Sequence, residues 1–178
     1  QIPLNGNYDE TPTIMTEKTI KLGNYEDLRQ SNSKPFRLNV GNNSHFIVKY
    51  DETLLKDIFA YSEMLDAISQ LQLLQDFRLL AESVKISYAS VVPILTRFAN
   101  HPSSVVNAAL YQVAGNLKKF VTPGSDEETQ LQALFNKLST RQVTRLGWTP
   151  KAGESNDDQL TRPYVLNASL YAKNTDAI

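Results

Sequence analysis

Residues 38–51 read Leu-Asn-Val-Gly-Asn-Asn-Ser-His-Phe-Ile-Val-Lys-Tyr-Asp and separate two kinds of sequence pattern. Phe46, Val48 and Tyr50 alternate with His45, Ile47 and Lys49, a period of two that predicts a half-buried strand. The preceding Gly-Asn-Asn-Ser is typical of a turn, and Asp51 is a good N-cap for a helix. We therefore expect strands and turns before residue 51 and helices after it.

The composition bounds the class of protein. With 178 residues, 41% of them hydrophobic and 21% charged, the chain is an ordinary globular protein of about one domain, with room for a second small one. A net charge of −1 gives no electrostatic reason to expect nucleic acid or an anionic membrane as a partner. The absence of cysteine excludes disulfides, thiolate metal sites and cysteine nucleophiles, and no run of about 18 apolar residues predicts a membrane span.

The first 50 residues predict an incomplete sheet. Short apolar alternations in 13–22 and 35–40 predict, with the stretch above, three or four short strands. So few strands hardly cover both faces of a sheet, so this part is interpreted as a partial β-sandwich. The start Gln1-Ile2-Pro3-Leu4 resembles the middle of a strand, and we expect the chain to be a fragment of a longer protein.

Apolar stripes at helical spacing predict five or six helices after residue 51. Expected start and stop signals are Ser87 or Ser90 for the third helix, Ser103 for the fourth, and Ser125 with Glu128 as a capping box for the fifth, which ends at Gly147 in the αL conformation. The last helix is expected from about Asp158. The inward residues are Leu54, Ile58, Tyr61, Leu65 and Ile68; Leu73, Leu74, Phe77, Leu80, Ala81 and Val84; Val91, Ile94, Leu95 and Phe98; Val106, Leu110, Val113 and Leu117; Leu131, Leu134, Phe135, Leu138 and Val143; and Tyr164, Val165, Ala168 and Tyr171.

The predicted fold class is therefore α+β. A short N-terminal antiparallel β segment, the partial β-sandwich domain of residues 1–51, precedes a mainly α antiparallel helical-hairpin stack at residues 52–178. Gln72, Gln75, Arg78 and Glu82 are expected to face away from the core.

No residue is predicted to be catalytic or to bind a metal. His45 and His101 are isolated, without a second His at helical spacing, and the acids at 126–128 and 157–158 stand at helix starts, where acids are expected. No glycine-rich phosphate loop and no G-x-S-x-G motif is present. The substrate-binding residues are left open.

Asp76 has two interpretations, since it lies mid-helix beside Leu73, Phe77 and Leu80. It is either an exposed or edge residue, or a buried structural cap or ion pair, because an unpaired buried carboxylate is costly. Asn42-Asn43-Ser44 and Asn167-Ala168-Ser169 match glycosylation sequons, a triplet that also arises by chance.

Several motifs, in order along nearly the whole chain, resemble the aminopeptidase N family of zinc metallopeptidases (gluzincin aminopeptidases). They are Ile2-Pro3-Leu4, then Leu38-Asn39-Val40-Gly41 with the stretch 45–51, then residues 73–81 (Leu-Leu-Gln-Asp-Phe-Arg-Leu-Leu-Ala), and finally Leu146-Gly147-Trp148 with Glu154-Ser155 and Leu160-Thr161-Arg162. Ile47 and Gln70 stand at or near positions where the family usually has arginine, and His45 replaces an aromatic residue.

The resemblance implies the end of the family's β-sandwich domain and the start of its helical C-terminal domain, which caps the active-site chamber. It implies a non-catalytic part of a cytoplasmic, bacterial zinc aminopeptidase that removes N-terminal residues from peptides. The zinc and its ligands belong to the parent enzyme, upstream of this chain, and the partners are the remaining domains, peptide substrates and, through exposed strands, a second copy. The alternative is a stand-alone helical protein–protein interaction module with a β-arm.

Overall fold

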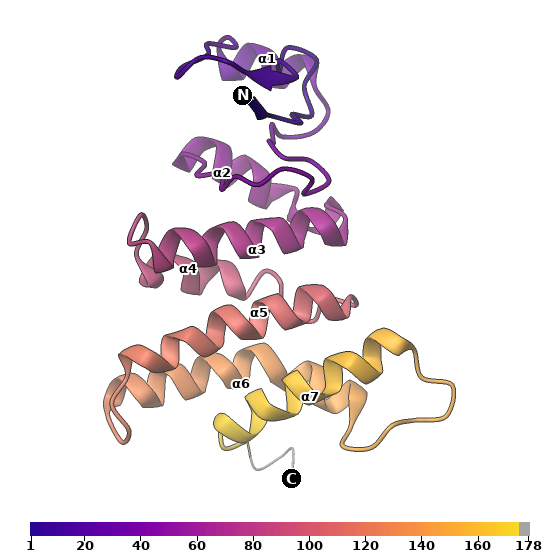
Figure 1. Cartoon of the computed structure of the whole chain (residues 1–178). Helices are drawn as coiled ribbons and strands as arrows, with labels where there is room; N and C mark the ends of the chain where they lie inside the picture. Colours follow the sequence, from indigo (N-terminus) through magenta and orange to yellow (C-terminus); the bar gives the residue numbers. More distant parts are fainter. Residues whose placement is uncertain (175–178) are drawn as a thin grey trace. The chain divides into compact units, whose positions relative to one another are not determined.

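The computed structural model describes residues 1–174 and contains a short sheet followed by helices (Figure 1). The predicted α+β class is confirmed, and the described residues form two compact units, residues 1–76 and residues 77 onward. The elements in chain order are β1 (Ile2–Pro3), β2 (Ile14–Met15), α1 (Tyr25–Ser31), α2 (Glu52–Ala60), the 3-10 helix η1 (Ser62–Met64), α3 (Ala67–Glu82), α4 (Tyr88–Leu95), α5 (Ser104–Asn116), the 3-10 helix η2 (Leu117–Phe120), α6 (Asp126–Leu146) and α7 (Asn156–Tyr171). No helix in this part of the chain is long and apolar enough to cross a bilayer.

The first unit is built on a minimal antiparallel sheet. Ile2 pairs with Met15 and Pro3 with Ile14, and the N–H of Leu4 donates to the carbonyl of Thr13 at 3.0 Å just beyond them. The backbone N–H groups of Asn39 and Val40 donate to the carbonyls of Leu4 and Asn5, at 2.9 Å each. The segment around Pro35–Val40, predicted as a strand, thus lies against residues 4–7 without regular strand geometry.

The predicted strand at residues 45–50 is wrong, although its burial pattern is right. Val48 is buried, Phe46 and Tyr50 are half-buried, and the residues between them are exposed. However, the N–H of Val48 donates to the side chain of Asp76 at 3.3 Å instead of to a neighbouring strand. The alternation therefore reports an extended segment with one buried face, and no β-ladder forms along it.

Two helix predictions in this region need correction. The stripe from Leu54 to Ile68 is not one helix, because α2 ends at Ala60 and a 3-10 turn intervenes before α3. Gln72 was expected to face solvent but is buried, and its Nε2 donates to the carbonyl of Leu38 at 3.1 Å.

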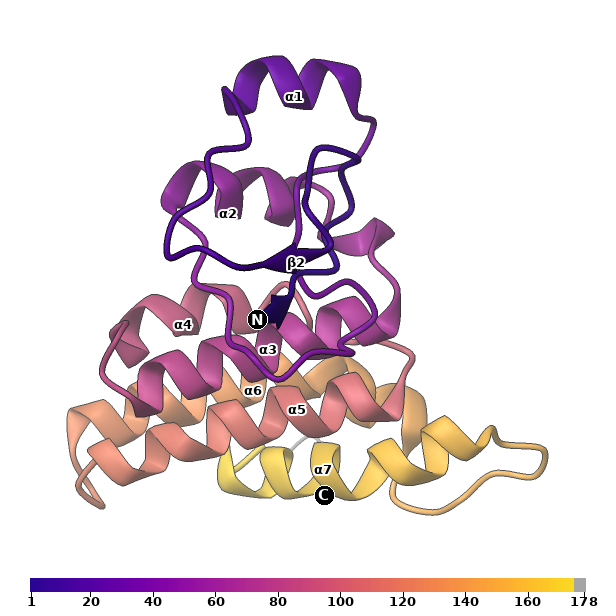
Figure 2. The same cartoon turned by 45° about the horizontal axis from the view of Figure 1, so that its top comes forward.

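The second unit is a stack of helices, in which α6 runs antiparallel to α5 and α7 (Figure 2). The hydroxyl of Tyr111 in α5 donates to the carbonyl of Leu138 in α6 at 3.0 Å. The predicted inward residues Val106, Leu110 and Val113 are buried, as are most of those of α6. Two residues that their spacing placed on an inward stripe are exposed in this unit: Val84, just after the end of α3, at 86%, and Tyr164 in α7 at 43%.

The predicted helix signals are largely confirmed. Ser87, not Ser90, caps α4, and Ser125 accepts from the N–H of Glu128 at 3.2 Å. The Glu128 carboxylate in turn accepts a hydrogen bond from the N–H of Gly124 at 2.7 Å. Gly147 ends α6 with φ 68° but ψ −175°, so its φ is positive as expected while its conformation is not αL.

Candidate binding groove between α1 and α2

The first unit carries two adjoining hollows between α1 and α2, which we call the groove. One hollow, of about 460 Å³, is lined by Leu22, Gly23, Asn24, Tyr25, Glu26, Leu28, Phe36, Asp51, Thr53 and Leu54. The other, of about 480 Å³, shares Tyr25, Glu26 and Thr53 with it and adds Arg29, Gln30, Asp57 and Tyr61. Volumes of this size suit one or a few side chains of a bound molecule.

A hydrogen-bonded network joins the two helices at the second hollow. The Asp57 Oδ2 of α2 accepts from the Tyr25 hydroxyl at 2.5 Å and from the Arg29 Nε at 2.6 Å, both in α1. The Arg29 guanidinium carbon also lies 4.9 Å from the centre of the Tyr61 ring, a cation–π contact. One carboxylate therefore holds α1 to α2 and fixes the side chain of Tyr25 at the wall of the groove.

The electrostatics of this network follow from its contacts. Burial raises the pKa of Asp57, but the hydrogen bonds from Arg29 and Tyr25 outweigh it, and the pKa is lowered. Burial and the hydrogen bond to Asp57 raise the pKa of Tyr25 well above its ordinary value. The triad therefore holds a carboxylate, a neutral phenol and a guanidinium at neutral pH, which is a structural ion pair and no general base.

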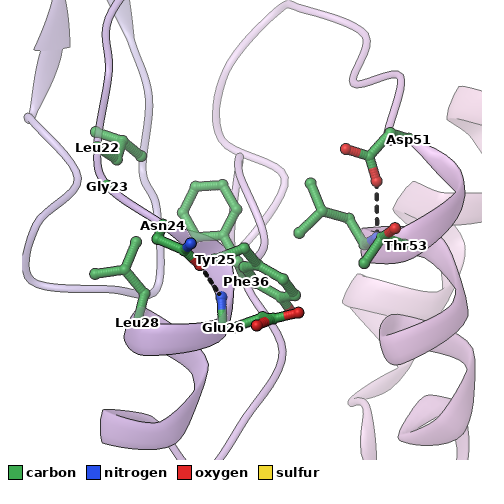
Figure 3. Close-up of a pocket in the computed structure, with 10 residues that line it drawn as sticks. Leu22, Gly23, Asn24, Tyr25, Glu26, Leu28, Phe36, Asp51 and Thr53 are labelled. Carbon is green, nitrogen blue, oxygen red and sulfur yellow. Dashed lines mark hydrogen bonds between the residues drawn. The ribbon is translucent and has the colours of Figure 1, made fainter.

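The first hollow is lined by the acidic side chains of Glu26 and Asp51 and by apolar side chains that include Leu22, Leu28 and Phe36 (Figure 3). Glu26 extends from α1 toward α2, and Asp51 stands across from it at the start of α2. Asp51 Oδ1 caps α2 by accepting from the N–H of Leu54 at 2.8 Å, and Asn24 Oδ1 caps α1 by accepting from the N–H of Glu26 at 2.8 Å. The two helix starts thus present polar groups to the same hollow.

The sequence did not predict this groove. The strand and helix patterns described above do not mark α1, which begins at Tyr25. A signal was present, because Asn24 followed by Glu26 and Asp27 is an N-cap with acidic residues in the first turn.

Asp76 is the one singled-out carboxylate that is buried, with a relative exposure of 6%. It accepts from the N–H of Val48, so the interpretation as a buried structural cap is confirmed. Burial raises its pKa to about 6, although the hydrogen bonds from Val48 and Gln72 lower it.

Of the singled-out histidines and acids, His101 and Asp157 lie close enough for their charges to interact. His45 is exposed, while His101 accepts from the N–H of Ser103 through Nδ1 at 3.0 Å, and burial lowers its pKa. Asp158 pairs with Arg145 at 2.6 Å, and Asp157 accepts from the N–H of Ser104. Within residues 1–174, no three His, Cys, Asp or Glu residues lie close enough to hold a metal, so the side chains described do not fit a zinc site.

The motif after Gly147 has a structural role in the second unit. Arg162 of α7 forms a buried ion pair with Glu154 and donates to the carbonyls of Leu146 and Gly147. A cation at the C-terminal end of α6 complements the helix dipole and satisfies carbonyls that have no helical partner. The loop between α6 and α7 is thereby held to both helices.

These arrangements can be compared with known proteins. A family model described as "ERAP1-like C-terminal domain" matches residues 36–178. The chain belongs to this family. It is also similar to the aminopeptidase N of Lactobacillus helveticus, with 57% identity over 178 residues that cover 100% of this chain and 21% of the relative.

Two further relatives extend the comparison. The aminopeptidase N of Lactobacillus delbrueckii subsp. lactis is 55% identical over 177 residues, covering 99% of this chain and 21% of the relative. That of Lactococcus lactis subsp. cremoris (strain MG1363) is 38% identical over 177 residues, with the same coverages. The resemblance to the C-terminal region of the aminopeptidase N family is therefore confirmed. The chain spans about a fifth of the length of these relatives.

Proposed function

We propose that this chain is the non-catalytic C-terminal part of a zinc-dependent aminopeptidase that removes N-terminal residues from peptides. The observation that carries the proposal is the 57% identity to an aminopeptidase N along all 178 residues, together with the match to its C-terminal domain family. A chance resemblance, on which the stand-alone interaction module depends, is not compatible with that identity. The residues 1–51 are proposed to complete a β-sandwich domain with other parts of the polypeptide, and residues 52–178 to cap the active-site chamber.

The zinc is proposed to be held elsewhere in the parent enzyme. One histidine of this chain is exposed at residue 45, and the other, at residue 101, accepts a hydrogen bond from the backbone of its own loop. The contribution of this chain is then structural: the buried ion pair of Arg162 with Glu154 and the helix caps stabilise the helical stack. The remaining domains of the same polypeptide are its proposed partners, peptides are the proposed substrates, and a cytoplasmic location is proposed from the bacterial relatives.

The purified 178-residue chain tests the non-catalytic part of this proposal. We expect no stoichiometric zinc by elemental analysis after incubation with zinc and dialysis, and no hydrolysis of aminoacyl arylamides. One zinc per chain that is lost on replacing His45 or His101, together with arylamide hydrolysis, would overturn it. The Lactobacillus helveticus enzyme under the same conditions is the positive control.

A further inference from the structure

The acidic hollow at the starts of α1 and α2 has a chemical character that points to an occupant. We propose that it binds a peptide segment in which a lysine or arginine is flanked by apolar residues. This proposal goes beyond the aminopeptidase function, because it concerns a surface of the first unit and requires no catalytic step.

The apolar part of the hollow supplies the contact area. Leu22, Leu28, Phe36 and Leu54 line it, and each remains half-buried, so each still exposes apolar surface to solvent. Covering such surface is favourable by about 25 cal/mol for each Å² removed from water. The aliphatic stem of a lysine or arginine, or a flanking leucine, matches this lining.

The charged side chains that line the hollow favour a positively charged ligand. Glu26 and Asp51 are the charged residues among the ten that line it, and no lysine, arginine or histidine is among them. Neither carboxylate takes part in the ion pairs Arg29–Asp57, Arg78–Glu82, Arg145–Asp158 and Arg162–Glu154. Because the two carboxylates stand on opposite walls, a cationic head between them gains from both, whereas an acidic ligand is repelled by both.

Two polar side chains can bind the peptide backbone. Asn24 uses its Oδ1 to cap α1, so its side-chain N–H₂ group can donate to a ligand, and Thr53 on the facing wall carries a hydroxyl. A few polar groups in a mostly apolar hollow fix the orientation of a ligand. The rigid wall at Tyr25, held by Asp57, favours a preformed site over one that is assembled on binding.

The experiment titrates the complete ¹⁵N-labelled chain with three peptides of equal length. The probe is the acetylated, amidated peptide Gly-Leu-Lys-Leu-Gly, and the two comparison peptides carry norleucine or glutamate in place of lysine. We expect amide shifts confined to residues 22–28, 36 and 51–54, and a Kd for the lysine peptide about threefold to tenfold lower than for norleucine, since exposed ion pairs contribute modestly. That preference should shrink at 0.5 M salt, because screening weakens exposed pairs.

Variants separate the charge effect from folding. The double variant Glu26→Gln/Asp51→Asn keeps a good N-cap on α2, because asparagine also caps helices, and should bind the lysine and norleucine peptides equally. Glu63→Gln, an exposed acid outside the hollow, should keep the preference. Equal binding of the lysine and glutamate peptides by the unmodified chain, shifts elsewhere, or no shift at millimolar peptide would each overturn the proposal.

Discussion

Asp157 in the first turn of α7 accepts a hydrogen bond from the backbone N–H of Ser104, the first residue of α5, at 2.6 Å. Ser103, at the N-cap position of α5, forms no capping bond with its own side chain. One helix therefore completes the start of another, and the two starts are held together in the second unit. The sequence placed Asp157 at a helix start but could not show that it serves a second helix.

Replacing Asp157 by alanine should destabilise the second unit, because an N–H at the start of α5 loses its partner and α7 loses a first-turn acid. Asp126→Ala removes only a first-turn acid, from α6, and is the matched control. We expect a larger fall in the urea midpoint for Asp157→Ala than for Asp126→Ala. The hydrogen bonds from Ser104 lower the pKa of Asp157, so the difference should be present at neutral pH and vanish as the pH falls through that lowered pKa. Equal midpoints for the two variants would contradict the cap.

Asp76 should make the first unit less stable as the pH rises from about 4 to 6. Its pKa is about 6 in the folded chain against an ordinary 3.8, so the folded state holds a proton that the unfolded state has released in this window. A pKa difference of this size corresponds to about 3 kcal/mol in favour of the protonated form in the folded chain.

The variant Asp76→Asn isolates this effect, since its amide oxygen can still accept from the N–H of Val48. We expect it to lose the fall in the free energy of unfolding between pH 4 and 6 and to be at least as stable as the parent at pH 7.5. Urea unfolding at both pH values measures this. A variant that keeps the pH dependence of the parent and is less stable at pH 7.5 would show that the carboxylate is stabilising when ionised.

Gly147 should not tolerate a side chain. Its φ of 68° and ψ of −175° lie in a region that is essentially restricted to glycine, although a Cβ there meets no atom closer than 3.9 Å. Gly147→Ala should therefore cost at least roughly 1 kcal/mol through backbone strain alone. Gly115→Ala, inside α5 and without a neighbour within 4 Å of the added Cβ, should instead stabilise by up to about 1 kcal/mol. Thermal unfolding of both variants measures these effects. If both substitutions shift the midpoint in the same direction, the prediction of opposite effects is wrong.

Local sequence signals predict several helix ends, but not the C-terminal end of α3. The caps at Ser87 and Ser125 and the glycine at 147 act through local contacts, so their residues carry the signal. By contrast, α3 ends before Val84, a β-branched residue at φ 59°, where glycine is the usual choice. The apolar stripe through Leu80 and Val84 therefore predicts a helix that is about one turn too long. No local sequence pattern indicates that the N–H of Lys85 bonds to the carbonyl of Leu80.

Long-range partners explain the other differences. The alternation at residues 45–50 reports one buried face, but only the fold shows that Val48 is bound by Asp76 instead of a neighbouring strand. The apolar stripe continues through Tyr61 and Leu65 at helical spacing, so it does not show the break after Ala60, although Leu65 is in extended backbone. The groove depends on Tyr25 meeting Asp57 across 32 positions, which no local pattern encodes.

The short sheet should lead the isolated chain to self-associate. Leu4 and Val48 are buried, but Ile2 and Ile14 of the two strands remain 45% and 44% exposed. Unpaired strand edges favour pairing between chains, and a charge on an edge opposes it. We expect sedimentation to show dimers or larger species at high micromolar concentration, Ile14→Lys to shift them toward monomer, and Met64→Lys, outside the sheet, to leave them unchanged. A parent chain that sediments as a monomer would refute this.

The central claim is that this chain serves as the C-terminal structural part of an aminopeptidase. The most direct measurement exchanges it for the matching segment of the Lactobacillus helveticus aminopeptidase N, 57% identical over 178 residues, and determines kcat/KM for an aminoacyl arylamide. We predict a soluble, zinc-loaded chimera with kcat/KM within about tenfold of the parent, and loss of activity when the segment is deleted. A chimera that is folded by circular dichroism and carries one zinc, yet cleaves no arylamide, would contradict the claim.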